Sequence, residues 1–229
     1  MDLPKGKLIF TRRGMPDMYI LYAFSTPNSL RVAIALEELG LEYKIVPINV
    51  RTGEQKTEAH LVRNPNGKVP VLVDPDSVTG EPFTLTESGA ILLYLAEKTG
   101  KLLPENTQER ARVYEQVFFH LTGIGPAFGQ LGYFKRQASA EMPVAINRFQ
   151  IEADRVLAVF DRTLASRVFA AGREFTLADI THFSWLWRRE FAGIGFDHIP
   201  NVERWYRQIE SRPAVLRAID KLGALVPDQ

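Results

Sequence analysis

The stretch 64–98 constrains the fold of this chain more than any other segment. It begins with a short run of mainly β-branched residues, 69–73, that is interrupted by Pro70. Turn-forming residues follow at 74–80, then a second short strand pattern at 83–86 and a strongly apolar helix. Because only a turn separates the two strands, we expect them to pair antiparallel.

Pro70 restricts how the first of these strands begins. Proline cannot donate to a β-ladder, so we expect it at the start or on the edge of the strand, with Lys68 and Val69 turned away from the sheet and open to a ligand. A cis Val69–Pro70 bond is one way to build this arrangement, and a trans proline that opens a strand is the commoner one. The stretch alone favours the trans form.

The apolar helix begins at Glu87-Ser88-Gly89-Ala90. We expect Ser88 to be the N-cap of a helix over 89–98, with Glu87 just outside it. The unpaired N–H groups and partial positive charge of a helix N-terminus bind a carboxylate readily, and the small residues leave this end uncrowded. On spacing alone, a capped helix without a ligand is the simpler interpretation.

The segment before this stretch predicts a strand–helix–strand unit. Residues 18–22 form an apolar strand pattern, Pro27 suits a first helical turn, Gly40 suits a helix end, and 43–48 is the next strand pattern. That order implies a right-handed crossover and a parallel pair. Together the patterns predict a thioredoxin-like α/β domain over 18–98.

An all-helical domain is expected after a polar linker at 99–109. From 110 to 229 no strand pattern remains, and apolar residues recur at helical spacing. We expect the segment 123–126 to bend or break one helix, and Thr176 with Asp179 to form a capping box at the start of another.

Composition limits the classes of function. The 229 residues are 45% hydrophobic and 24% charged with a formal net charge of +1, so neither nucleic acid nor a polyanionic partner is indicated. No apolar run approaches the roughly 20 residues of a membrane helix, and the apolar segment within 1–17 is too short for a signal-peptide core. We therefore expect a cytoplasmic protein without a membrane partner, in which residues 1–17 are an N-terminal extension.

The chain has no cysteine. A protein disulfide, a zinc–thiolate site or a CxxC redox pair is therefore impossible, and any thiol chemistry must use a thiol that a ligand brings. The four histidines are isolated in the sequence and show no metal-binding spacing, so no metal is expected; they are His60, His120, His182 and His198.

Three of these motifs carry a family resemblance. Lys-Val-Pro at 68–70, Glu-Ser-Gly-Ala-Ile-Leu-Leu-Tyr-Leu-Ala at 87–96 and Thr-Leu-Ala-Asp-Ile at 176–180 resemble the glutathione transferase superfamily, and the similarity extends over residues 18–222. The resemblance implies a thioredoxin-like N-terminal domain, an all-α C-terminal domain and a homodimer with each site near the subunit junction.

The same resemblance implies a glutathione site. The Val69 backbone before a cis proline would pair with the peptide backbone of glutathione, with Lys68 beside it. Glu87 and Ser88 would hold the γ-glutamyl group. Reduced glutathione would be the co-substrate and oxidised glutathione the product.

Ser-Thr-Pro-Asn at 25–28 and Ile-Gly-Pro-Ala-Phe-Gly-Gln at 124–130 are most similar to bacterial Nu-class enzymes, which reduce disulfide bonds with glutathione. In that group the threonine and the asparagine contact the sulfurs, which implies this role for Thr26 and Asn28. Further contacts are implied for Gln55 and Arg148. Local sequence alone favours turn or capping roles for the first pair and surface roles for the second.

Without a cysteine, the resemblance implies an enzyme that reduces small disulfides with two glutathione thiols and conjugates electrophiles weakly. One alternative is a conventional glutathione transferase, in which Ser25 or Thr26 activates a single glutathione for conjugation to an electrophile. Another is a non-catalytic scaffold with this fold. Four residues after the Gly-Pro pair either line the pocket for the second substrate or pack helices: Phe128, Gln130, Tyr133 and Phe134.

Overall fold

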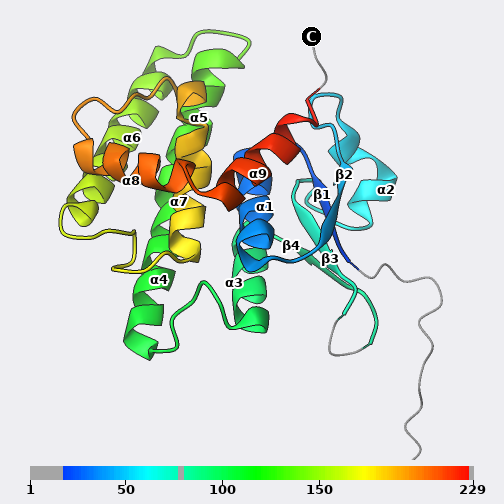
Figure 1. The fold of residues 1–229 in the computed structure, drawn as a ribbon. Helices are drawn as coiled ribbons and strands as arrows, with labels where there is room; N and C mark the ends of the chain where they lie inside the picture. The colour runs from blue at the N-terminus through cyan, green and yellow to red at the C-terminus, as the bar shows by residue number, and fades with distance from the viewer. Residues whose placement is uncertain (1–17, 77–79, 227–229) are drawn as a thin grey trace, which may run out of the picture.

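The computed structural model describes residues 18–76 and 80–226. The extension expected at 1–17 lies outside the described residues. A sheet with its helices lies beside a bundle of helices, and the last helix returns to the first part of the chain (Figure 1). This is the expected α/β thioredoxin-like domain followed by an all-α domain.

The sheet has four strands in the order β2-β1-β3-β4. They are β1 (Tyr19–Ala23), β2 (Tyr43–Pro47), β3 (Val71–Asp74) and β4 (Phe83–Thr86). β1 and β2 are parallel, as the strand–helix–strand order predicts, and β3 and β4 are antiparallel, as the short turn predicts. β3 also pairs antiparallel with β1, which places the end of β1 in the middle of the sheet.

Two helices cover the face of the sheet that is turned toward the helical part, α1 (Pro27–Leu39) and α3 (Ser88–Thr99) (Figure 1). The short η1 (Glu54–Lys56) and α2 (Glu58–Leu61) connect β2 to β3. α1 begins where the sequence predicts, because Pro27 occupies the first turn, and it ends at Gly40, whose φ of 67° is left-handed.

The helical part contains α4 (Thr107–Phe119), η2 (His120–Ile124), α5 (Gly125–Arg136), α6 (Pro143–Leu164), α7 (Leu177–Trp187), η3 (Arg189–Ala192), α8 (Pro200–Glu210) and α9 (Pro213–Gly223). The sequence predicts that 123–126 bends or breaks a helix, and of these two possibilities the structure excludes a break. The chain stays helical there, because η2 is a π-helical segment that leads directly into α5.

The glycines of this segment allow α5 to approach α7 closely. A Cβ atom on Gly125 would lie 3.3 Å from Nε1 of Trp185, and one on Gly129 would lie 3.1 Å from the same indole ring. An alanine at either position would therefore require the Trp185 ring to shift by a few tenths of an ångström.

The capping box at the start of α7 is present. Thr176 Oγ1 accepts from the backbone N–H of Ala178 in the first turn of α7. The Asp179 carboxylate accepts from the backbone N–H of Thr176. Asp179 is fully buried and also accepts from the Ala170 backbone at 2.7 Å and from Nε1 of Trp205 at 2.8 Å. Its role is to fix α7 against its neighbours, as the sequence indicates.

Ion pairs join α1 to α9 and to Arg212, the N-cap residue of α9. Nε and Nη2 of Arg212 donate to the Glu38 carboxylate at 2.6 and 2.9 Å. Glu37 forms ion pairs with Arg217 and Lys221. These pairs anchor the sheet side of the molecule to the helical side. Within 18–76 and 80–226, no helix has both the length and the apolar character needed to cross a membrane.

Candidate active site

A cleft of about 420 Å³ lies where the N-termini of α1 and α3 face the start of α5 and the end of α7. Its lining comes from both halves of the chain: Asn28, Arg31, Glu87, Ser88, Gly89, Ala90, His120, Leu121, Gly125, Pro126, Gly129, Gln130 and Trp185. Of the predicted site residues, the structure brings Asn28, Glu87 and Ser88 together in this cleft.

Asn28 lies in the first turn of α1, and its side chain does not cap that helix. Its Oδ1 accepts a hydrogen bond from Nε1 of Trp185 at 3.3 Å. Since indole nitrogen can only donate, the amide oxygen must face Trp185, which leaves the two N–H bonds of Nδ2 available to the cleft. Asn28 thus has a donor for an anion such as a thiolate.

Thr26 has the capping role that local sequence favours. Its Oγ1 accepts from the Ser29 backbone at 3.2 Å and donates to Ser29 Oγ at 3.0 Å. The hydroxyl must rotate away from Ser29 before it can donate to a ligand. Among the two predicted sulfur contacts, Asn28 therefore has the freer donor.

Thr26 lines a second, smaller cavity of about 210 Å³, which Trp185 also lines. The walls of this cavity include Phe24, Arg51, Arg188 and Phe191. Trp185 lines both cavities, so it is shared by the place of Asn28 and the place of Thr26.

The start of α3 differs from the prediction by one residue. Ser88 is the first helical residue, and Glu87 is the N-cap, with no side-chain capping bond. Glu87 has φ 63° and ψ 108°, a conformation that non-glycine residues rarely adopt. The first-turn N–H groups are thus left without a side-chain cap at residues that line the cleft, an arrangement that suits a carboxylate.

Lys68 and Val69 lie just before β3, in a segment that hydrogen bonds to the Lys68 carbonyl fix in place. The Val69–Pro70 bond is cis, the form that the resemblance implies and that the stretch alone does not favour. His60 Nε2 and Asn64 Nδ2 both donate to the Lys68 carbonyl at 2.9 Å. The Lys68 side chain is exposed, and neither residue lines the main cleft.

Gln55 and Arg148 lie away from the cleft lining. Gln55 is half-buried in η1, after β2, where its Nε2 donates to the Val50 carbonyl at 3.4 Å. Arg148 is exposed on α6, with its guanidinium 3.9 Å from the Glu152 carboxylate. The structure of one chain does not bring either of them to Asn28.

Of the four residues that were expected either to line a pocket or to pack helices, only Gln130 lines the cleft. Phe128 is fully buried, and Phe134 stacks on Phe149 with ring centroids 5.7 Å apart. Tyr133 is 46% exposed and packs against Phe134.

Sequence reasoning missed Trp185, Arg31 and His120, which all line the cleft. His120 and His182, which are isolated in sequence, contact each other through their Nδ1 atoms at 3.3 Å. No local pattern marks these residues, because the contacts join α1, η2 and α7. Only the helix packing brings them together.

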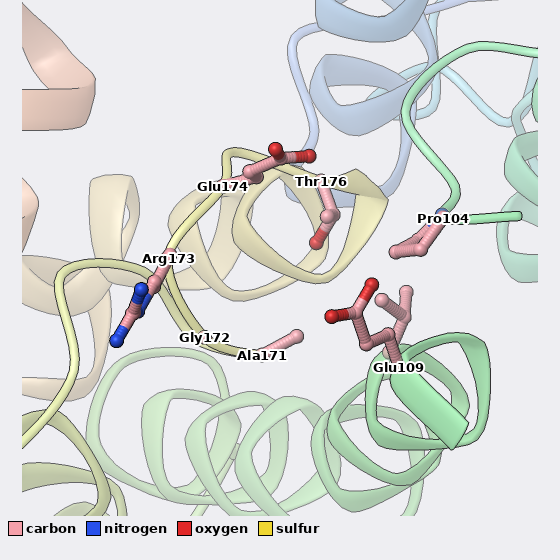
Figure 2. Close-up of a pocket in the computed structure, with 8 residues that line it drawn as sticks. Pro104, Glu109, Ala171, Gly172, Arg173, Glu174 and Thr176 are labelled. Atoms are coloured by element: carbon pink, nitrogen blue, oxygen red, sulfur yellow. The ribbon is translucent and has the colours of Figure 1, made fainter. Parts of the chain in front are cut away.

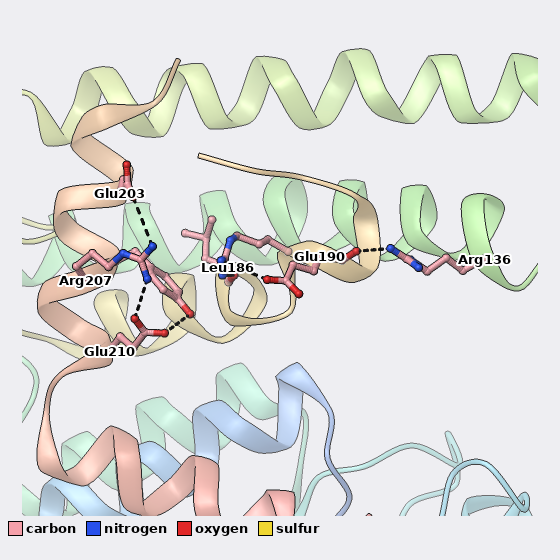
Figure 3. Close-up of polar contacts among 8 residues, drawn as sticks. Arg136, Leu186, Glu190, Glu203, Arg207 and Glu210 are labelled. Carbon is pink, nitrogen blue, oxygen red and sulfur yellow. Dashed lines mark hydrogen bonds and ion pairs between the residues drawn. The ribbon is translucent and has the colours of Figure 1, made fainter. Parts of the chain in front are cut away.

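The end of α5 holds η3, the short helix that follows α7, in place. Arg136 donates to the carbonyls of Glu190 and Phe191 at 2.7 and 2.8 Å, and Lys135 donates to that of Ala192 at 3.0 Å. Figure 3 shows the Arg136–Glu190 contact beside the Glu203–Arg207–Glu210 group of α8. These contacts fix η3, and with it the Phe191 wall of the smaller cavity.

A further cavity of about 290 Å³ lies between α4 and the segment before α7 (Figure 2). Glu109, Arg173 and Glu174 are among its lining residues. None of the predicted site residues lines it, so it is separate from the cleft at Asn28.

Comparison with known families identifies the class of protein. Residues 17–97 match the glutathione S-transferase N-terminal domain, and residues 145–213 match the glutathione S-transferase C-terminal domain. The chain therefore belongs to the glutathione S-transferase family. This confirms both the resemblance and the architecture that it implies.

Particular relatives narrow the comparison. The disulfide-bond oxidoreductase YfcG of Escherichia coli strain K12 is 37% identical over 207 residues, covering 89% of this chain and 95% of the relative. The disulfide-bond oxidoreductase YghU of the same strain is 37% identical over 212 residues, covering 86% of this chain and 72% of the relative.

Solved structures agree with the fold. A glutathione transferase from Burkholderia graminis with two glutathione molecules bound per subunit is 38% identical, with a TM-score of 0.85 over 90% of this chain and 88% of that chain. One from Pseudomonas putida with one glutathione disulfide bound per subunit is 35% identical, with a TM-score of 0.84 over 89% of this chain and 91% of that chain.

Proposed function

We propose that this chain is a glutathione-dependent disulfide-bond oxidoreductase of the Nu-class kind, in which two glutathione thiols perform the chemistry. The observation that carries the proposal is one cleft that joins the Asn28 amide to the uncapped start of α3, in a chain without cysteine. Further support comes from relatives that are named disulfide-bond oxidoreductases and from related structures with two glutathiones or one glutathione disulfide.

In this proposal the start of α3 holds the γ-glutamyl group. Its carboxylate would accept from the first-turn N–H groups and the Ser88 hydroxyl, and the Glu87 carboxylate would pair with its amine. The Val69 backbone, beside Lys68, would bind the peptide part. Gln55 and Arg148 are proposed as further contacts on the resemblance alone.

The sulfurs would lie near Asn28 and Thr26. One glutathione thiolate attacks a sulfur of the substrate disulfide, which forms a mixed disulfide and releases one substrate thiol after protonation. The second thiolate attacks the glutathione sulfur of the mixed disulfide, which yields glutathione disulfide and releases the second substrate thiol. The protein contributes proximity and a donor for the thiolate.

Calorimetric titration with reduced and then oxidised glutathione tests this function. Two reduced glutathiones per subunit, or one tightly bound oxidised molecule, are expected. One reduced glutathione with weak binding of the oxidised form would instead favour a conjugating transferase. No heat from either would favour a non-catalytic scaffold.

Asn28→Ala separates the two enzymatic functions. We expect loss of disulfide reduction with any conjugating activity retained, because conjugation can use a hydroxyl of Ser25 or Thr26. Asn147→Ala, an exposed change on α6, is the matched control and should leave both activities unchanged. A homodimer and a cytoplasmic location complete the proposal.

A further inference from the structure

Arg31 is a buried cation without a carboxylate partner among the described residues. It lies one helical turn beyond Asn28 on α1, and only 1% of it is exposed. Its Nε donates to Ser184 Oγ at 3.2 Å and its Nη2 to His120 Nε2 at 3.2 Å. Its Nη1 is buried and has no hydrogen-bond partner within 18–76 and 80–226.

The histidines around Arg31 do not compensate its charge. Because His120 accepts from Arg31 through Nε2, its remaining proton is on Nδ1, which faces Nδ1 of His182 at 3.3 Å. Burial and the Arg31 charge hold the pKa of His120 well below 6.5 and lower the pKa of His182 to about 3. Burial lowers the pKa of Arg31 to about 9, which leaves it protonated at neutral pH.

A buried charge in neutral surroundings is costly, so its retention needs a physical reason. The other charged groups on the elements around it do not provide one, and the buried Asp179 of α7 accepts from Ala170, Thr176 and Trp205 instead. Glu37 and Glu38 of α1 pair with α9, and Glu87 is the only carboxylate among the described residues that line the cleft. Glu87 is exposed, and no ion pair joins it to Arg31.

Arg31 and Asn28 line the same cleft. Residues three apart on a helix share a face and lie about 5–6 Å apart at Cβ. The positive N-terminus of α1 adds to the field at this point. The unpaired charge therefore acts on the place where the Asn28 amide faces the cleft.

We propose that Arg31 is the counter-charge that keeps a glutathione thiolate ionised at Asn28. This inference rests on the proposed function and adds a positioning residue to it. The bound thiol loses its proton to solvent, the guanidinium keeps its own, and no bond forms between sulfur and protein. Arg31 acts through space, whereas Asn28 donates directly.

The test is a pH titration of the thiolate ultraviolet absorbance of bound glutathione in the full chain. A unit charge about 10 Å away, at an effective dielectric constant of about 20, shifts a pKa by about one unit. Arg31→Met should therefore raise the pKa of the bound thiol by about one unit, with roughly tenfold less thiolate well below that pKa. Arg31→Lys should retain most of the shift, because it keeps the charge.

A second readout separates this role from a structural one. Removing an uncompensated buried charge should leave the unfolding temperature unchanged or higher in Arg31→Met. If that variant does not fold, Arg31→Gln removes the charge while keeping a donor for the same site. Arg155→Met, which breaks an exposed ion pair on α6, is the matched control and should change neither measurement.

The outcomes are distinct. A bound-thiol pKa that is the same in wild type and in the charge-removing variants would overturn the role of Arg31 and leave the proposed function intact. A wild-type chain that binds no glutathione would overturn both. Equal losses of folding in the lysine and methionine variants, with an unchanged thiol pKa in the folded fraction, would show that Arg31 is structural only.

Discussion

Nε1 of Trp185, near the end of α7, donates a hydrogen bond to Oδ1 of Asn28, in the first turn of α1, across 3.3 Å. The contact decides which end of the amide faces the cleft. An asparagine whose oxygen is held by an N–H donor must present its own N–H₂ group on the other side. The helical half of the molecule thereby orients a donor that belongs to the sheet half.

Trp185→Phe should lower disulfide reduction by roughly three- to tenfold. The change keeps an aromatic ring at the position that lines both cavities and removes the N–H, whose hydrogen bond is worth about 1 kcal/mol. Steady-state kinetics with a small neutral disulfide measures the effect. Trp187→Phe, two residues further along α7 and absent from the lining of both cavities, is the control. Equal rates in the two variants would show that Trp185 does not orient Asn28.

The backbone conformation of Glu87 should lower the stability of the folded protein. Its φ of 63° and ψ of 108° suit glycine, and such strain is worth about 1–3 kcal/mol. We expect Glu87→Gly to raise the free energy of unfolding by about 1 kcal/mol, after the added freedom of the unfolded chain is subtracted. The same variant should bind glutathione more weakly, because the carboxylate is lost.

Glu87→Ala is the matched control for that prediction. It removes the carboxylate and keeps the strain, so it should lose glutathione affinity without a gain in stability. Denaturant unfolding and calorimetry on both variants provide the comparison. If glycine and alanine give the same unfolding free energy, the backbone at this position is not strained.

Local patterns predicted most of the fold, and the family resemblance implied about half of the cleft. Pro27, Gly40 and the capping box at Thr176 each act within a few residues, so the sequence shows the helix ends directly. The N-cap of α3 was misplaced by one residue because a serine is a better capping residue than a glutamate. In the structure Glu87 is the N-cap despite its strained backbone, although the local sequence favours Ser88 for that position.

The other half of the cleft was not predictable from the sequence. Arg31 and Ser184 are 153 positions apart, and Asn28 and Trp185 are 157 apart. Helical periodicity places Arg31 on a buried face, where an arginine without a carboxylate partner has no local explanation. Such a residue becomes informative only after its neighbours are known.

Gly132→Ala should destabilise the protein. A Cβ at this position would lie 2.2 Å from two ring carbons of Phe191, so either the ring or α5 must move. We expect a loss of about 1–3 kcal/mol, and a change in the smaller cavity that Phe191 lines. Gly223→Ala in α9 has no heavy atom within 4 Å and should be neutral or slightly stabilising. Thermal unfolding of the two variants distinguishes steric overlap from a general effect of alanine in a helix.

The buried histidines should make stability fall in acid. His182, with its pKa lowered to about 3 by burial, stays neutral in the folded state where the unfolded chain, with a pKa of 6.5, takes up a proton. The pKa of His120 is shifted in the same direction. Between pH 6.5 and about 3 the unfolded state therefore binds more protons, and stability falls as pH decreases, by up to about 1.4 kcal/mol per pH unit for each histidine.

Asp179 opposes this trend over part of the range. Burial raises its pKa from 3.8 to about 6, so between these values the folded state binds the extra proton and stability rises as pH decreases. Two histidines change the free energy of unfolding more per pH unit than one carboxylate does. Between pH 6.5 and about 6 only the histidines contribute. The net result is a loss of stability that begins near pH 6.5.

Denaturant unfolding at a series of pH values measures this slope. The double variant His120→Gln, His182→Gln should flatten it between pH 6.5 and about 6, whatever its absolute stability, because neither glutamine titrates, and below pH 6 the contribution of Asp179 should make stability rise as pH decreases. His198→Gln, an exposed change before α8, should leave the slope as in wild type. A double variant with the wild-type slope would mean that the acid sensitivity arises elsewhere, and that the cluster around Arg31 does not exclude protons as its burial requires.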